Sequence, residues 1–285
     1  MSKIQVDNAV IMAAGTASRF APLSYERPKA LIEVKGEILI ERQIRQLREA
    51  GIRDIYVVTG YRAEDFSYLT EKFGVRLRHN PEYNSRNNHS SIYAVRDILR
   101  NSYVCSADNY FLQNPFEAAV DGAYYAAVYA AGETAEWCLT TDADDRITAV
   151  TVGGQKAWYM LGHTFWDEAF SHRFIEILEV EYDLPETADR LWEAIYMEHL
   201  DELQMKLRRY QPDFIFEFDT LDELRTFDDS YIEDTRSAIL AEIAAKRGIS
   251  QGQIVEIKTI KGENNEAIGC SYEVDGQREA YYYAG

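Results

Sequence analysis

The hydrophobic positions in the first third of the chain follow two different spacings. Residues 9–14 form an almost unbroken apolar run that ends at Gly15, and residues 55–59 form a second such run. Between them, in residues 38–50, apolar side chains recur every three or four positions up to Gly51. The runs are typical of strands covered on both faces, and the spaced pattern predicts an amphipathic helix with a glycine stop. Together they predict a right-handed strand, helix, strand unit of a parallel sheet.

Two more units of this kind follow, with predicted helices and strands at residues 64–73, 75–78, 90–99 and 103–106. Gly15 follows the first strand of the series, and Asp108 follows the last. In open parallel sheets, ligands bind outside the carboxyl ends of the strands. We therefore expect Gly15 and Asp108 to lie on the same edge of the sheet.

The pattern changes in the middle of the chain. Residues 123–165 carry short, alternating, aromatic-rich runs, which predict inserted antiparallel strands. Helical spacing returns at residues 167–179 and 187–200, and a predicted strand at residues 214–218 leads to Asp219. These elements predict an α/β fold with a mostly parallel, Rossmann-like sheet flanked by helices and an antiparallel, aromatic-rich insertion.

The last part of the chain has a different composition. A helix with Ser230 as its cap is predicted up to Lys246, and a β-hairpin is predicted around the Asp275-Gly276 pair. We therefore divide the chain into a main domain, residues 1–228, and a small helix-and-hairpin extension, residues 229–285.

Composition narrows the classes of partner. The 285 residues carry 30 basic and 48 acidic side chains, a formal net charge of -18, whereas proteins that bind nucleic acid cluster Lys and Arg. We therefore expect no nucleic-acid partner. Cys105, Cys138 and Cys270 are far apart, which favours buried thiols in a reducing cytoplasm. No window approaches the roughly 18 apolar residues of a membrane span, so we expect no membrane insertion and a cytoplasmic location.

Residues 8–29 are the stretch around which the candidate chemistry is arranged. A buried strand ends in a glycine turn, and Arg19 and Lys29 follow on a polar loop. Such a turn presents backbone N–H groups to an anion, with Arg19 suited to bidentate contact and Lys29 acting as a point charge. The stretch contains neither GxxxxGK[ST] nor GxGxxG. By spacing alone, it fits a phosphate-binding loop and an ordinary turn with two surface cations equally well.

The order of the residues in this stretch is more specific. The string AAGTASRFAPL at residues 13–23, followed by RPKAL at residues 27–31, closely resembles the signature of the nucleotidyltransferases that activate sugar 1-phosphates and phosphocholine. Further along, DNY, EW and FWD at residues 108–110, 136–137 and 165–167 resemble the bacterial phosphocholine cytidylyltransferases rather than the sugar enzymes. The resemblance covers residues 8–228 in order and implies the nucleotidyltransferase fold.

One position departs from the family pattern. Ala17 stands where the family usually has a second glycine in the loop. If this position needs a positive φ, alanine is strained there.

The resemblance implies a role for each matching residue. The backbone of residues 13–15 would hold the base and ribose of CTP, and polar groups of residues 87–90 would help to select cytosine. Arg19 would contact the leaving pyrophosphate, and Lys29 would contact the reacting phosphates. The nucleotide-binding residues implied in this way are Ala13, Ala14, Gly15, Ser18, Arg19, Asn87, Asn88 and Ser90.

Two carboxylates complete the implied catalytic set of Arg19, Lys29, Asp108 and Asp219. Asp108 and Asp219 would bind Mg²⁺, a hard cation that combines a few carboxylates with phosphate oxygens. Two acids at strand ends, near local cations, also suit an in-line displacement at phosphorus. For either carboxylate alone, a solvated strand-end acid or a helix cap is the alternative interpretation.

The acceptor pocket is predicted from aromatic and acidic side chains. A quaternary ammonium is best held by ring faces backed by carboxylates. The candidates are Trp137, Trp192, Tyr129, Glu136, Asp189 and Glu217, with Trp158 as a further ring. For each ring taken alone, a place in the hydrophobic core is the alternative.

The implied function is the transfer of CMP from CTP to phosphocholine, which gives CDP-choline and pyrophosphate. The first alternative keeps the chemistry and uses 2-aminoethylphosphonate or phosphoethanolamine as the phosphorylated amino-alcohol. A sugar 1-phosphate acceptor is a third possibility. A catalytically inactive nucleotide sensor belongs to another class, and the presence of all four implied catalytic residues argues against it.

The extension allows two further hypotheses. Residues 254–285 resemble the opening strands of a choline-kinase-type domain, which would suggest fusion to or association with a choline kinase, without kinase activity in this chain. The alternative is a plain hairpin that forms a homo-oligomer contact.

Overall fold

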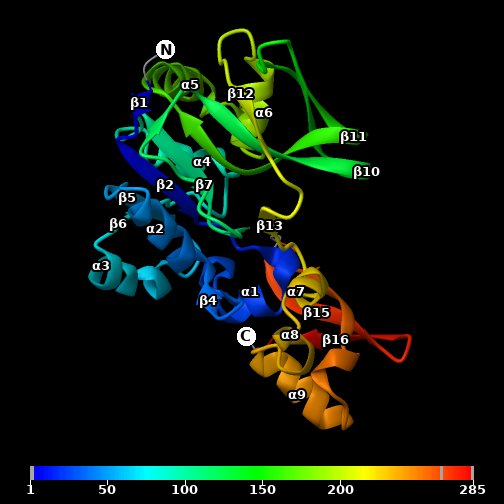
Figure 1. Ribbon diagram of the computed structural model, residues 1–285. Coiled ribbons are helices and arrows are strands. Elements are labelled where there is room, and N and C mark those ends of the chain that lie inside the picture. Colours follow the sequence, from blue (N-terminus) through cyan, green and yellow to red (C-terminus); the bar gives the residue numbers. More distant parts are fainter. Residues whose placement is uncertain (1–2, 264–265, 284–285) are drawn as a thin grey trace. The chain divides into compact units, whose positions relative to one another are not determined.

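The computed structural model describes residues 3–263 and 266–283, and in it the chain forms two compact units. Unit 1 comprises Met1–Gly15 and Ile40–Glu217, and unit 2 comprises Thr16–Leu39 and Phe218–Gly285. Figure 1 shows the chain coloured along its length. Both the loop with Arg19 and Lys29 and the C-terminal extension belong to unit 2. The functional division at residue 228 stays a prediction.

Unit 1 is built on a seven-stranded sheet in the described part of the chain. Its strands, in spatial order, are β12 (Lys206–Tyr210), β10 (Tyr124–Thr141), β11 (Ile147–Trp166), β7 (Ser102–Ser106), β2 (Asn8–Ala13), β5 (Ile55–Thr59) and β6 (Arg76–His79). Only β11 runs against its two neighbours, so four of the six neighbouring pairs are parallel. The mostly parallel α/β sheet is confirmed.

The centre of this sheet agrees closely with the pattern of apolar runs. All five residues of β5 are buried, and β2 is buried except at Met12. β2 and β7 are parallel neighbours, with Met12 opposite Ser106. Gly15 and Asp108 therefore follow the same edge of the sheet, as predicted.

The helices before β7 differ in length from the prediction. α2 (Leu39–Glu49) agrees with it, whereas residues 64–73 form a 3-10 turn, η3 (Ala63–Phe66), followed by α3 (Tyr68–Phe73). The predicted helix at 90–99 was too long, because α4 (His89–Tyr93) gives way to turns. In these turns, N–H groups bond to carbonyls three residues earlier, as Ile98 does with Val95.

The aromatic-rich insertion consists of two long strands rather than several short ones. β10 and β11 pair antiparallel from Tyr124 opposite Phe165 to Thr141 opposite Ile147, with repeated register shifts. Figure 1 shows them running side by side over most of their length. The shifts interrupt the alternation of buried and exposed residues, which explains why the sequence pattern looked like separate short strands.

Small two-stranded pairs complete the strands of unit 1. β1 (Ile4–Gln5) pairs with β9 (Ala119–Val120), and β8 (Asn109–Phe111) pairs antiparallel with β13 (Ile215–Glu217). Because β8 begins directly after Asp108, this second pairing brings Glu217 opposite Asn109.

The helical region after β11 contains one wrong prediction. α5 (Glu168–Glu181) begins as expected, with the Asp167 carboxylate accepting a bond from the Phe170 N–H at 2.9 Å. Residues 187–200, however, are not one helix. They contain the end of η4 (Pro185–Thr187), a stretch outside any helix, and then α6 (Trp192–Glu198).

Unit 2 joins the loop after β2 to the C-terminal extension. Its elements from the loop are η1 (Ser18–Phe20), α1 (Leu23–Glu26), η2 (Lys29–Leu31), β3 (Glu33–Val34) and β4 (Glu37–Ile38). Those from the C-terminal part are α7 (Leu221–Phe227), α8 (Ser230–Glu233), α9 (Ala238–Arg247), η5 (Gln251–Gln253), β14 (Val255–Lys261), β15 (Ala267–Val274) and β16 (Gln277–Tyr282).

The extension corrects one predicted helix and confirms the hairpin. The helix expected from Ser230 to Lys246 is broken into α8 and α9, because Arg236 has a φ of 59° between them, and Ser237 rather than Ser230 caps α9. Asp275 and Gly276 both have positive φ, 51° and 74°, as a two-residue hairpin turn requires.

Contacts within unit 2 hold the extension to the loop. The Thr259 hydroxyl of β14 donates to the Ser18 carbonyl, and the rings of Tyr25 and Tyr283 stack with centroids 3.8 Å apart. The Glu26 carboxylate accepts a bond from the N–H of Ile239 at 3.1 Å. The extension is therefore part of the same compact unit as the loop that carries Arg19.

The three cysteines agree with the prediction of buried thiols. Cys105, Cys138 and Cys270 are free and buried. Among the described residues, no helix has both the length and the apolar composition needed to cross a membrane.

Ala17 provides a test of strain in the loop. It precedes η1 with φ 45° and ψ 47°, the left-handed conformation in which a Cβ is unfavourable. Ala17→Gly should raise the free energy of unfolding by up to about 1 kcal/mol, since relief of this strain exceeds the extra chain entropy of glycine. Urea unfolding measures this. Ala135→Gly, at an exposed position of β10, is the control and should lower stability. Equal losses in both variants would contradict the prediction.

Candidate active site

Arg19, Lys29 and Asp219 lie together in unit 2. Arg19 Nη1 is 2.7 Å from Asp219 Oδ2, and Lys29 Nζ is 3.9 Å from Asp219 Oδ1. Lys29 also lies over the Phe20 ring, 5.8 Å from its centroid. The structure thus brings together three of the four predicted catalytic residues, from η1, η2 and the segment before α7.

The two cations differ strongly in exposure. The Lys29 side chain is 7% exposed and that of Arg19 is 75% exposed, while the shared Asp219 carboxylate is 32% exposed. A buried ammonium is weakly screened by water and needs a negative partner, which Asp219 provides. The arrangement offers one fixed, protein-buried charge and one solvent-accessible guanidinium, and both suit an anionic ligand.

The turn after β2 is open on its outer side. The Ala14 carbonyl accepts a bond from the Tyr61 N–H at 3.0 Å. Gly15 is exposed, has no positive φ, and a Cβ built there would meet no protein atom within 4 Å. The protein's own packing therefore does not require glycine at this position, whereas Ala17 occupies the left-handed conformation.

The polar residues expected to select cytosine have partners within unit 1. The Asn87 side chain donates to the Asp189 carbonyl at 2.9 Å. Ser90 is buried, and its hydroxyl donates to the Asn87 carbonyl at 2.7 Å and accepts from Asn80 at 2.8 Å. Asn88 bonds to residues at the start of α6. The segment at residues 87–90 is thus held in place by the protein itself.

These same contacts explain why residues 187–200 do not form one helix. The carbonyls of Ala188, Asp189 and Arg190 accept bonds from residues 87–89 instead of from helical N–H groups. Burial lowers the pKa of His89, and its Nδ1 donates to the Arg190 carbonyl across 2.7 Å. The helix can therefore start only at Trp192.

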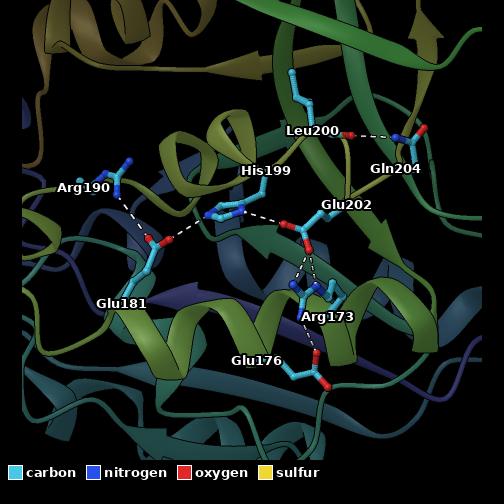
Figure 2. A network of polar contacts seen from close by, with 8 residues as sticks. All are labelled: Arg173, Glu176, Glu181, Arg190, His199, Leu200, Glu202 and Gln204. Atoms are coloured by element: carbon cyan, nitrogen blue, oxygen red, sulfur yellow. Dashed lines mark hydrogen bonds and ion pairs between the residues drawn. The ribbon is translucent and has the colours of Figure 1, made fainter.

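Figure 2 shows the polar contacts that link Arg190, His199 and Glu202 to Glu181 and Arg173 of α5. Arg190 pairs with Glu181 at 3.3 Å, and His199 Nε2 lies 2.8 Å from the same carboxylate. His199 Nδ1 lies 3.4 Å from Glu202, which also pairs with Arg173 of α5. Residues 188–199 are thus bonded to residues 87–89 on one side and linked to α5 on the other.

Trp192 lies in the core of unit 1. Its side chain is 1% exposed and packs against Tyr125, Trp166 and Phe174, with centroids 5.7, 5.1 and 5.9 Å away. The neighbouring Asp189 is exposed. The acceptor role of Trp192 stays a prediction, and its packing identifies it as a core residue as well.

The other acceptor candidates lie on β10, β11 and β13. Tyr129 is opposite Trp158, with ring centroids 5.3 Å apart, and Trp137 is partly buried against the core. Glu217 accepts a bond from Asn109 at 3.2 Å. Burial and the negative charges of Glu136 and Glu217 raise the pKa of Tyr159. Both carboxylates therefore interact electrostatically with the same tyrosine side chain.

Glu193 is a buried carboxylate next to predicted site residues that the sequence prediction missed. Its carboxylate accepts bonds from Asn88 Nδ2 at 3.1 Å and from the Tyr125 hydroxyl at 3.2 Å. Burial raises its pKa to about 7, against the pull of these two bonds. The sequence shows that Glu193 directly follows Trp192. It does not show the burial of this carboxylate or its hydrogen bond to Asn88, 105 residues away.

The described residues contain no group of three or more His, Cys, Asp and Glu side chains arranged to hold a metal. A cation bound by Asp108 and Asp219 would therefore need further ligands. Phosphate oxygens of a nucleotide supply such ligands for Mg²⁺, which is usually bound by one or two carboxylates together with substrate phosphates. Asp108 and Asp219 each supply a carboxylate of the kind that this mode of binding uses.

Comparison with known proteins gives a consistent set of relatives. A family model described as the MobA-like NTP transferase domain matches residues 9–150. The choline-phosphate cytidylyltransferase of Streptococcus pneumoniae is 34% identical over 221 residues, which are 78% of this chain and 96% of that protein. The 2-aminoethylphosphonate cytidylyltransferase of Lancefieldella rimae is 32% identical over 240 residues, which are 83% of this chain and 98% of that protein.

Solved structures agree with these relatives. The CTP:phosphocholine cytidylyltransferase from Streptococcus pneumoniae has a TM-score of 0.76 and 35% identity, over 80% of this chain and 99% of that chain. The inositol-1-phosphate CTP transferase from T. maritima has a TM-score of 0.60 at 13% identity, over 87% of this chain and all of that one, which is a likeness of fold alone. The predicted fold class is confirmed.

The raised pKa of Glu193 predicts a pH-dependent stability. A carboxyl whose pKa rises from 4.5 to about 7 on folding favours the folded state below pH 4.5, and this advantage is lost as the pH rises through 7. Glu193→Gln removes the charge; its amide oxygen can accept from Asn88 Nδ2 while its NH₂ group donates to the Tyr125 hydroxyl oxygen, so the variant should be more stable than the wild type at pH 8 by on the order of 2 kcal/mol. Near pH 4.5 the gain should be small.

Urea unfolding at pH 4.5 and pH 8 measures this difference. Glu133→Gln, at an exposed position of β10, serves as the control and should change stability little at either pH. A Glu193→Gln variant with the same stability difference at both pH values would show that Glu193 does not titrate between them.

Proposed function

The chain belongs to the family of bacterial cytidylyltransferases that includes the choline-phosphate and 2-aminoethylphosphonate enzymes, and we propose that it transfers CMP from CTP to phosphocholine. It is a nucleotidyltransferase, and the resemblance seen in its sequence is confirmed. The observation that carries the proposal is the convergence of Arg19 and Lys29 on Asp219, in the loop that resembles the family signature.

The proposed reaction needs no nucleophilic side chain. A phosphate oxygen of the acceptor attacks the α-phosphorus of CTP, the bond from that phosphorus to the bridging oxygen breaks, and pyrophosphate leaves. Catalysis then depends on positioning and on neutralising the charge that develops. Lys29, whose buried ammonium is weakly screened, would contact the reacting phosphates, and the exposed Arg19 would contact the pyrophosphate.

The nucleotide would lie against the turn after β2. Gly15 leaves open space where another residue would carry a Cβ, which supports close approach of a ligand to the backbone of residues 13–15. Ser18 belongs to the same loop, and residues 87–90 are proposed to face the cytosine base. Mg²⁺ bound by Asp108 and Asp219 would neutralise charge on the triphosphate.

The acceptor is proposed to bind among the rings and carboxylates of β10, β11 and β13. Glu136 and Glu217 both act on Tyr159, and Trp137 lies on the same strand as Glu136. Negative charge beside ring faces suits a trimethylammonium group. A second candidate acceptor is 2-aminoethylphosphonate, because the relative that carries this name matches 83% of the chain. Its primary ammonium would need hydrogen-bond acceptors, which the same carboxylates supply.

Pyrophosphate release tests the proposed reaction. The purified chain should release pyrophosphate with CTP and phosphocholine in the presence of Mg²⁺, and far less with UTP, dTTP or ATP, or without Mg²⁺. The acceptor panel is phosphocholine, 2-aminoethylphosphonate, phosphoethanolamine and glucose 1-phosphate. A preference for the phosphonate would replace phosphocholine as the acceptor, and no turnover with any pair would refute the proposed activity.

The role of Trp137 is tested by separating the two Michaelis constants. Trp137→Ala should raise KM for phosphocholine about fivefold, since a cation–π contact contributes on the order of 1 kcal/mol, and leave KM for CTP nearly unchanged. Trp137→Phe keeps a ring and should have a smaller effect. Equal rises of both constants would mean that Trp137 only packs in the core.

A further inference from the structure

Two segments of unit 1 that are distant in the sequence bond to each other residue by residue. The Asn87 N–H donates to the Ala188 carbonyl at 2.8 Å, and its side chain donates to the next carbonyl, that of Asp189. His89 bonds to the Arg190 carbonyl. Residues 188–190 lack helical hydrogen bonds at these carbonyls, so their conformation depends on residues 87–89.

Asn88 completes this contact with both ends of its side chain. Its Oδ1 accepts a bond from the Trp192 N–H at 2.7 Å, and its Nδ2 donates to Glu193 Oε2 at 3.1 Å. The Trp192 N–H belongs to the first turn of α6, where N–H groups have no partner within the helix. Asn88 therefore caps α6 from a segment about 100 residues away in the sequence.

Glu193 gives this cap a second, charged contact. Its other oxygen, Oε1, accepts from the Tyr125 hydroxyl of β10 at 3.2 Å, so the carboxylate links β10, α6 and residue 88. The charges of Glu193 and Glu217 both add to burial in raising the pKa of Tyr125. The carboxylate is thus held in a fixed position close to the predicted acceptor residues.

We propose that Asn88 and Glu193 are a positioning pair that fixes the start of α6 to residues 87–90, the segment proposed to select cytosine. The pair also holds residues 188–193, which contain the predicted acceptor residues Asp189 and Trp192. In this proposal Asn88 acts through the protein, because both ends of its side chain are bonded to α6, and contact with the cytosine base is left to the other residues of 87–90. Because the two segments share these bonds, order in one supports order in the other. The inference rests on the proposed function only for the roles of the two segments.

An exchange of donor and acceptor tests the pair. In Asn88→Asp, two carboxylates face each other across about the present 3.1 Å, so KM for the acceptor should rise about tenfold or more at pH 8. In Asn88→Asp combined with Glu193→Gln, the glutamine amide donates to the aspartate, and the bond forms again in the opposite direction. The double variant should return to within about threefold of the Glu193→Gln variant.

The matched control is Asn84→Asp. Asn84 is exposed and lies four residues before Asn88, so this variant adds the same charge nearby without facing Glu193. It should leave both Michaelis constants close to those of the wild type.

Hydrogen exchange provides a readout that does not depend on activity. The backbone N–H of Trp192, which bonds to Asn88 Oδ1, should exchange about tenfold faster in Asn88→Asp and regain its protection in the double variant. If the wild type shows no turnover, the proposed function fails, while this exchange pattern still tests the pair.

Two outcomes would overturn the proposal. If the double variant stays as impaired as Asn88→Asp, with KM for CTP raised more than KM for the acceptor, Asn88 contacts the nucleotide directly. If Asn88→Asp has the kinetics and the Trp192 exchange rate of the wild type, the pair does not position α6.

Discussion

The need of backbone carbonyls for hydrogen-bond donors shapes the centre of unit 1. The carbonyls of residues 188–190 lie outside any helix and are satisfied by residues 87–89. Because of this constraint α6 begins only at Trp192, and the Trp192 ring lies in the hydrophobic core. It also leaves Glu193 in the first helical turn, beside Asn88 and Tyr125, where burial raises its pKa. Packing, helix boundary and electrostatics all follow from the same few bonds.

In unit 2 the corresponding constraint is the burial of a charged side chain. Lys29 is buried, and a buried ammonium requires a counterion. Asp219 supplies it, just after the chain enters the C-terminal part of unit 2 at Phe218. A ligand that competes for these charges would alter the Arg19 and Lys29 pairs together, because both end on one carboxylate. The chain thus keeps its only predicted catalytic cations in a mutually dependent arrangement.

The sequence predicted those elements whose pattern of apolar residues is sufficient to define them. It failed where an element's boundaries depend on hydrogen bonds or strand pairing with residues far away in the chain. Residues 55–59 form the strand that their apolar run predicted, and α2 has the expected amphipathic spacing. The helix at 187–200 was wrong, because its periodicity describes which side is buried and contains no information about donors at residues 87–89. The insertion was predicted as short strands, because register shifts break the alternation of β10 and β11. Arg19, Lys29 and Asp219 were predicted from the family resemblance, and the structure brings them together. Glu193 acquires its character only from burial beside Tyr125 and Asn88.

Ala17 shows how a loop can keep its conformation without the residue that best fits it. The left-handed φ of 45° lies at Ala17 and not at Gly15, so the loop retains the backbone shape for which glycine is favoured and accepts a strain of about 1–2 kcal/mol. The neighbouring Ser18 carbonyl is bonded by the Thr259 hydroxyl, and Tyr25 stacks on Tyr283. Both partners come from the C-terminal extension, whose contacts hold the loop in one conformation and offset the strain. The extension therefore contributes to the geometry of the loop that carries Arg19, whether or not it has an activity of its own.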